Sequence, residues 1–186
     1  KREFGLKPAL ADLDRDGDLD LIIGTAGGYP LYFRNTAAPG STSPAYTQPR
    51  RPVLGDWILE FGITNVGGSA APTFADFDGD GDLDLFIGNS AGNTLLFRNT
   101  AAPGFAPPST NPFGITDVGS GASPVFADLD GDGDLDLLIG SSDGNILFFR
   151  NTAPLLSPVR STTANGSYGI GRVINLTVEF SEAVLV

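Results

Sequence analysis

Short apolar runs, each closed by a glycine, recur three times along the chain and predict β-strands. They read Leu-Ile-Ile-Gly, Leu-Phe-Ile-Gly and Leu-Leu-Ile-Gly, at residues 21–24, 85–88 and 137–140. Runs of this length, bounded by glycine, are typical of strands rather than helices. After a short turn, each is followed by a second apolar run that ends in Phe-Arg-Asn-Thr. The turns Ala-Gly-Gly, Ala-Gly-Asn and Asp-Gly-Asn tolerate positive φ, so we expect a hairpin in every copy.

These runs belong to a repeat that aligns without a gap over residues 8–36, 72–100 and 124–152. In each copy a Pro-x-x-Ala-Asp segment precedes an acidic loop, and the two apolar runs follow. A Phe-Gly-Ile-Thr segment stands before two copies, at residues 61–64 and 113–116, and a shortened form stands at residues 3–6. Counting that segment as a strand predicts four antiparallel strands per repeat. Four-stranded units at this spacing indicate an all-β fold, a partial β-propeller of three blades.

The acidic loops concentrate fifteen of the chain's eighteen aspartates in the pattern Asp-x-Asp-x-Asp-Gly-Asp-Leu-Asp. Carboxylates about 5 Å apart repel by about 3 kcal/mol per pair at an effective dielectric near 20. A loop that curls them inward therefore needs a cation, and the predicted metal ligands are Asp12, Asp14, Asp16, Asp18, Asp20, Asp76, Asp78, Asp80, Asp82, Asp84, Asp128, Asp130, Asp132, Asp134 and Asp136.

The spacing within each loop favours Ca²⁺, which takes six to eight oxygen ligands from alternate positions of a turning chain. Positions 1, 3 and 5 supply side-chain oxygens, position 7 a backbone carbonyl and position 9 a closing carboxylate. Glycine fills the bend at residues 17, 81 and 133. An EF-hand would need a glutamate at position 12, where this chain has Ile23, Ile87 and Ile139. We therefore expect up to three structural Ca²⁺ ions, against the alternative of solvated acidic turns.

Composition narrows the function further. The 186 residues carry a net charge of −11, which becomes +4 without the fifteen loop aspartates, so the acidity indicates metal and argues against nucleic acid as a partner. The chain has no histidine or cysteine, and no nucleophile arrangement is visible, so we expect a non-catalytic protein.

No apolar run is long enough for membrane insertion. A low-affinity calcium module is most useful outside the cell, which predicts a secreted or cell-surface location.

The acidic loop, the apolar strand and the Phe-Arg-Asn-Thr ending resemble the FG-GAP/VCBS repeat family over roughly residues 4 to 152. That resemblance implies propeller blades like those of the integrin α-subunit head and several bacterial lectins, with Ca²⁺ in the blade loops and roles in adhesion and ligand binding. Residues 161–186 resemble the opening strands of an Ig-like or cadherin-like repeat of large bacterial surface proteins. The expected organisation is three blades over residues 1–152, a linker over 153–160 and a truncated β domain over 161–186.

Two further sets of residues were weighed as candidate sites. Arg34, Arg98 and Arg150 recur in every repeat, which favours a structural task, either a strand-end ion pair or hydrogen bonds to a neighbouring blade, over a ligand role. The long segment 37–60 holds Arg50, Arg51, Asp56, Trp57 and Glu60. We interpret it as an inter-blade loop whose tryptophan packs on a strand. A glycan site is the alternative, because a tryptophan face with nearby charges can stack on a sugar. Catalysis of hydrolysis by Asp56 and Glu60 as acid and base is a further alternative with less support, because spacing along a loop says little about the distance between two carboxylates.

The sequence therefore predicts a calcium-binding, non-catalytic propeller segment of a large secreted or surface bacterial protein, acting in adhesion or in binding a protein or glycan ligand. Alternatives are a lectin-like propeller and a non-catalytic part of a polysaccharide-degrading enzyme. Three blades cannot close a ring, so sheet faces and edges stay exposed. We accordingly expect the chain to self-associate.

Overall fold

The computed structural model describes residues 5–38, 41–47, 62–99 and 105–151, together with a short strand pair at 160–161 and 176–177. Contacts between Cα atoms divide the chain into two units, Lys1–Asn151 and Thr152–Val186. The described residues contain no helix that is long and apolar enough to cross a membrane.

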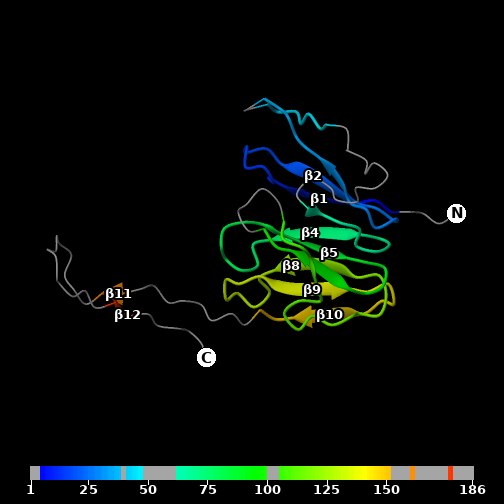
Figure 1. Cartoon of the computed structure of the whole chain (residues 1–186). Helices are drawn as coiled ribbons and strands as arrows, with labels where there is room; N and C mark the ends of the chain where they lie inside the picture. The colour runs from blue at the N-terminus through cyan, green and yellow to red at the C-terminus, as the bar shows by residue number, and fades with distance from the viewer. Residues whose placement is uncertain are drawn as a thin grey trace. The chain divides into compact units, whose positions relative to one another are not determined.

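Three antiparallel sheets form the first unit, one for each sequence repeat (Figure 1). The first sheet contains β1 (Lys7–Ala11), β2 (Asp20–Gly24) and β3 (Leu31–Phe33). The second contains β4 (Ala71–Ala75), β5 (Asp84–Gly88), β6 (Thr94–Phe97) and β7 (Ser109–Thr110). The third contains β8 (Ser123–Ala127), β9 (Asp136–Gly140) and β10 (Ile146–Phe149). The architecture is all-β, with antiparallel sheets of the kind found in propeller-like repeats.

Register and turns agree with the repeat pattern. Ala11 pairs with Asp20, Ala75 with Asp84 and Ala127 with Asp136, so each acidic loop connects two neighbouring strands at the same place. In the hairpins that follow, a glycine adopts positive φ: 78° at Gly28, 87° at Gly92 and 85° at Gly144. The predicted hairpins are therefore confirmed, because these turns need the left-handed conformations that glycine adopts without strain.

Within the described residues the Phe-Gly-Ile segment forms no strand, so the prediction that it supplies the fourth strand was wrong there. Phe113 and Gly114 lie in a turn, and residues 115–118 have no strand partner. The second sheet instead gains a fourth strand from β7, which pairs with β6. Within the described residues the first and third sheets have three strands each. The segment contributes to the hydrophobic cores instead, because Ile63 is buried in the first core and Ile115 in the second.

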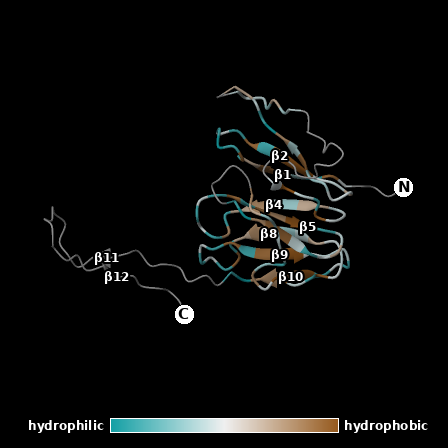
Figure 2. Cartoon of the chain, viewed as in Figure 1, coloured by the Kyte–Doolittle hydropathy of each residue, from teal (hydrophilic) through white to brown (hydrophobic). Residues whose placement is uncertain are grey.

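Face-to-face packing joins the three sheets. One core lies between the first and second sheets, where Ile22 and Tyr32 meet Leu85, Ile87 and Phe97. Between the second and third sheets the Phe86 and Phe126 rings lie 4.6 Å apart, and Phe77 and Phe126 lie 5.8 Å apart. Figure 2 shows hydrophobic residues concentrated in the strands of these sheets. The second sheet thus buries both faces, whereas its two neighbours each bury one.

The segment that precedes the first strand of a repeat forms hydrogen bonds to the preceding repeat. We call residues 66–70, before β4, and residues 118–122, before β8, the lead-in segments, and we call each contact between neighbouring sheets a joint. The Val66 amide donates to the Gly28 carbonyl (2.9 Å) and the Ala70 amide to the Thr25 carbonyl (3.0 Å). One repeat later, the Val118 amide donates to the Gly92 carbonyl (3.0 Å) and the Ala122 amide to the Asn89 carbonyl (2.9 Å). The two joints therefore use the same backbone bonds at equivalent positions.

Glycine is required where a lead-in crosses the preceding sheet. A Cβ placed on Gly24 would lie 2.1 Å from the Ala70 carbonyl oxygen, and one on Gly88 would lie 2.3 Å from that of Ala122. Neither glycine needs its conformational freedom for a positive φ. The glycine that ends each apolar run is thus explained at two joints by the close approach of another backbone.

In the second unit the structure describes only a strand pair, β11 (Arg160–Ser161) with β12 (Leu176–Thr177). The remaining residues of the expected Ig-like or cadherin-like segment lie outside the described residues. The expected linker over 153–160 and the boundaries of the domains stay predictions.

Candidate metal centres

Each acidic loop brings the first three of its predicted carboxylates together. In every loop one oxygen from each of three aspartates lies within 4.8 Å of the others, and these triads are Asp12, Asp14 and Asp16; Asp76, Asp78 and Asp80; and Asp128, Asp130 and Asp132. The triads correspond to loop positions 1, 3 and 5. Local hydrogen bonds explain why the spacing produces a cluster, because they curl the loop around its first carboxylate.

The position-1 carboxylate accepts a backbone N–H from the glycine at position 6 in all three loops. The Gly17 amide donates to Asp12 Oδ2 (3.0 Å), the Gly81 amide to Asp76 Oδ2 (3.0 Å) and the Gly133 amide to Asp128 Oδ2 (3.2 Å). These glycines have φ values of 91°, 90° and 97°. The prediction that glycine fills the sharpest bend is confirmed.

Loop position 4 also adopts the left-handed conformation, which the sequence analysis missed. Gly79 and Gly131 stand there with φ of 72° and 78°, and Arg15 stands there with φ of 61°. A non-glycine residue with positive φ is uncommon and strained. The signal in the sequence was the glycine shared by the second and third loops, Asp-Gly-Asp-Gly, which the first loop replaces with Asp-Arg-Asp-Gly.

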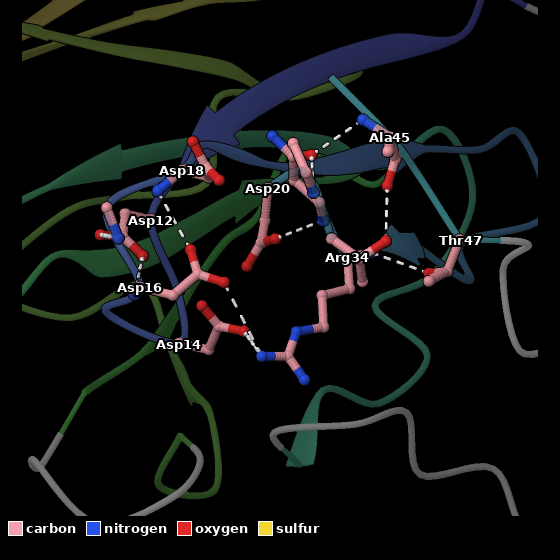
Figure 3. A network of polar contacts seen from close by, with 12 residues as sticks. Asp12, Asp14, Asp16, Asp18, Asp20, Arg34, Ala45 and Thr47 are labelled. Atoms are coloured by element: carbon pink, nitrogen blue, oxygen red, sulfur yellow. Dashed lines mark hydrogen bonds and ion pairs between the residues drawn. The ribbon is translucent and has the colours of Figure 1, made fainter. Parts of the chain in front are cut away.

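The recurring arginine pairs with the triad of its own repeat, as Figure 3 shows for Arg34 in the first repeat. Arg34 forms an ion pair with Asp14 and lies 3.8 Å from Asp16. Arg98 pairs with Asp78 in the second repeat, and in the third Arg150 pairs with Asp130 and lies 3.8 Å from Asp132. The structural ion pair expected for this arginine is therefore present in each repeat. Its partner is the metal loop rather than a neighbouring sheet.

The position-9 aspartates lie outside the triads and are fully buried or nearly so. The Asn35 amide donates to Asp20 Oδ1 (2.7 Å), and the Asn99 and Asn151 amides donate to Asp84 and Asp136 (2.8 Å each). The Tyr32 hydroxyl also donates to Asp20 Oδ2 (2.9 Å). Each of these carboxylates therefore ties the end of its loop to the backbone after the third strand of the repeat. The asparagine of Phe-Arg-Asn-Thr was the signal for this contact.

The pKa values of several loop carboxylates are raised, because burial and neighbouring carboxylates disfavour their charged forms. Burial raises the pKa of Asp84 to about 6, with further contributions from Asp80, Asp76 and Asp82, although the Asn99 amide opposes them. Burial likewise raises the pKa of Asp20, against the hydrogen bonds from Asn35 and Tyr32. Burial, followed by repulsion from Asp132 and the other loop carboxylates, raises the pKa of Asp134. Burial and the bond to Asp20 raise the pKa of the Tyr32 hydroxyl.

Buried carboxylate oxygens without a hydrogen-bond partner among the described residues occur in all three loops. They are Asp14 Oδ1, Asp76 Oδ1 and Asp134 Oδ2. Buried polar atoms are normally paired, and an unpaired carboxylate oxygen is especially unfavourable. In each loop three triad carboxylates and one arginine leave a net charge of −2. The donor set, made only of oxygens, suits one hard divalent cation per loop.

Asp18 and Asp82, at position 7, use their backbone N–H groups within the loop: Asp18 donates to Asp16 Oδ1 (3.0 Å), and Asp82 donates to Asp80 Oδ1 (2.9 Å). The Asp82 side chain also forms an ion pair with Arg15, which links the first loop to the second. Asp56, Trp57 and Glu60, the candidates in the long inter-repeat segment, lie outside the described residues.

Comparison with known proteins follows the same repeats. The FG-GAP-like repeat family matches residues 12–87 and 76–139. Cartilage acidic protein 1 from Mus musculus is 30% identical over 159 residues, which cover 76% of this chain and 21% of that protein. The Homo sapiens protein of the same name matches with the same identity and coverage. The chain thus spans about a fifth of the length of the curated relatives it matches.

Proposed function

The chain belongs to the FG-GAP-like repeat family, and from that premise we propose that it is a non-catalytic binding module that holds one Ca²⁺ in each of its three acidic loops. The observation that carries this proposal is the triad of carboxylates, repeated at the same loop positions and accompanied in each loop by a buried oxygen that has no hydrogen-bond partner among the described residues. Each of the three loops has such a triad and such an oxygen, which a solvated acidic turn does not require.

In each loop, positions 1, 3 and 5 would supply side-chain oxygens to the ion. Position 7 would add an oxygen, and in the third loop the buried Asp134 Oδ2 is available beside the backbone carbonyl. At position 9, carboxylate Oδ1 accepts the asparagine amide, so we assign this aspartate first to the loop's attachment, and its other oxygen would be the one to reach the ion. An oxygen shell of this irregular kind favours Ca²⁺ over Mg²⁺, which demands near-ideal octahedral geometry.

Titration calorimetry tests the metal assignment. We expect up to three Ca²⁺ sites and weaker binding of Mg²⁺. A triple variant, Asp14→Asn, Asp78→Asn and Asp130→Asn, removes one carboxylate from each triad and should abolish the calcium heat. The control Asp143→Asn removes a carboxylate outside the loops and should leave it unchanged. Equal or tighter Mg²⁺ binding, or a triple variant that still binds three Ca²⁺, contradicts the proposal.

The setting we propose is extracellular, where calcium is abundant enough to fill sites with a Kd of about 10⁻⁴ to 10⁻³ M. Its support is the family and the similarity to cartilage acidic protein 1. A structural metal in a rigid stack of sheets suits adhesion or ligand binding, and the absence of histidine and cysteine from the sequence removes the commonest catalytic bases and nucleophiles. Ligand class is tested by binding to immobilised glycans and matrix proteins with calcium and with EDTA. Turnover of a polysaccharide substrate by the chain alone would refute the non-catalytic assignment.

A further inference from the structure

The third sheet exposes a face whose equivalents in the other two sheets are buried or half-buried. We define this open face by Val125, Leu129, Leu138, Ile146 and Phe148. Ile146 is 74% exposed, whereas Thr94 at the same repeat position is 0% exposed. Phe148 is 52% exposed, whereas the equivalent Leu96 and Tyr32 are 5% and 6% exposed. In the first and second sheets, the strand that opens the next repeat covers this face.

Gly140 gives independent evidence that a backbone belongs over the open face. It is the third-sheet equivalent of Gly24 and Gly88, which a crossing carbonyl oxygen makes obligatory. A Cβ on Gly140 would meet nothing within 4 Å, and its φ is not positive. Glycine in a strand is unfavourable unless a close approach requires it. Within the described residues nothing makes that approach at Gly140.

The first sheet carries the complementary half of such a joint. Its outward face holds Leu6, Leu10, Leu21, Ile23 and Phe33, which align with residues that the second and third repeats pack against the preceding sheet. Leu10 is 51% exposed, whereas the equivalent Phe74 and Phe126 pack against the two cores. Ile23 is only half-buried, whereas Ile87 and Ile139 are fully buried.

We propose that the open face of the third sheet binds the outward face of the first sheet of a second copy of this chain. The same chain displays both halves of a joint that it already forms twice internally, which is why we commit to a second copy as the occupant. The contact is head-to-tail: residues around Leu6 cross over Gly140 as Ala70 crosses Gly24 and Ala122 crosses Gly88. Such a contact can form once, or twice if two copies close on each other.

This inference goes beyond the calcium proposal and does not require a metal ion in the loops, although Leu129 of the open face lies in the third loop. Light scattering after size exclusion, on the full chain in millimolar calcium, measures the association. We expect a concentration-dependent dimer. Gly140→Val places a side chain where the partner backbone must lie, and it should weaken association by about tenfold or more. Because a Cβ on Gly140 would meet no described residue within 4 Å, the variant should fold as well as the wild type. Ile146→Thr, which installs the residue found in the second sheet, is a second variant of the same face.

A mixing experiment distinguishes head-to-tail docking from general stickiness. Leu10→Asn alters only the outward face of the first sheet and Gly140→Val only the open face of the third sheet, so each variant alone should associate about tenfold or more weakly than the wild type. Mixed together they should form a one-to-one dimer through the intact open face of one variant and the intact outward face of the other. A monomeric wild type, an unweakened Gly140→Val variant, or mixed variants that stay monomeric would each overturn the proposal. A Gly140→Val chain that unfolds would also overturn it, since another part of the same chain would then cover the glycine.

Discussion

The second and third sheets are built from the same repeat, yet one is packed on both faces and the other on a single face. Along β6 three of the four residues are buried, whereas its equivalent β10 alternates between exposed and half-buried residues. Their metal loops nevertheless share the same triad, the same glycines with positive φ and the same arginine ion pair. The conformation of the loop therefore depends on local contacts, whereas the burial of a strand depends on the neighbouring repeat.

Truncating one apolar side chain in each sheet should give the largest difference between the two sheets in the free energy of unfolding. Leu96→Ala empties a buried position and should lower the free energy of unfolding by about 2–5 kcal/mol. Phe148→Ala, at the equivalent position, removes a half-exposed ring from the dilute monomer and should lower it by about 1 kcal/mol or less. Urea denaturation at low protein concentration measures both. Equal losses would mean that the third sheet is covered in solution.

Adding a methyl group to the strand-ending glycines tests the same difference from the opposite side. Gly88→Ala forces its Cβ against the Ala122 carbonyl and should destabilise the chain by about 1–3 kcal/mol, as overpacking typically does. Gly140→Ala has open space and should be neutral or stabilise the chain by up to about 1 kcal/mol. Thermal unfolding in calcium compares the two. A destabilised Gly140→Ala variant would contradict the open face.

Removing a triad carboxylate should affect the two sheets alike. If free calcium is about ten times Kd, each site contributes about 1.4 kcal/mol by linkage. Asp78→Ala and Asp130→Ala should each lose about that much of the calcium-dependent stabilisation, and neither should change the response to EDTA in the other loops. Melting temperatures with calcium and with EDTA give the coupling, and Asp143→Ala is the control for lost charge. If calcium raised the melting temperature of the wild type and of both variants equally, the triads would not be the metal sites.

The smallest effect concerns loop position 4, where the first loop differs from the others. Arg15→Gly relieves a left-handed non-glycine conformation that costs roughly 1–2 kcal/mol, and it gives up an exposed ion pair with Asp82 worth about 0–1 kcal/mol. We expect a net gain of up to about 1 kcal/mol. Arg15→Ala loses the same pair but keeps the strain, so it should not stabilise the chain. The two melting temperatures decide the matter, and a stabilising Arg15→Ala would refute the strain argument.

The candidate metal loops were largely predictable because their contacts are local. Asp12, Asp14 and Asp16 come together through bonds within six residues, and Gly17 bends the chain directly after them. The pairing of Arg34 with Asp14 spans one repeat, and repetition in the sequence made a structural role the favoured interpretation. Asp20 was predicted as a closing ligand, and its bond to the Asn35 amide could not be seen from spacing alone, since it joins residues fifteen apart in the chain.

The three repeats, the strand-loop-strand unit, the hairpin turns and the carboxylate triads could all be predicted from the sequence, because each depends on spacing within a few residues. The packing of the Phe-Gly-Ile segment and the backbone that crosses Gly24 and Gly88 became visible only in the folded chain. The same is true of Gly140, which no described backbone crosses. Those outcomes depend on which surface meets each sheet. Three nearly identical repeats meet different surroundings, so the local sequence cannot encode the difference between a covered face and an open one.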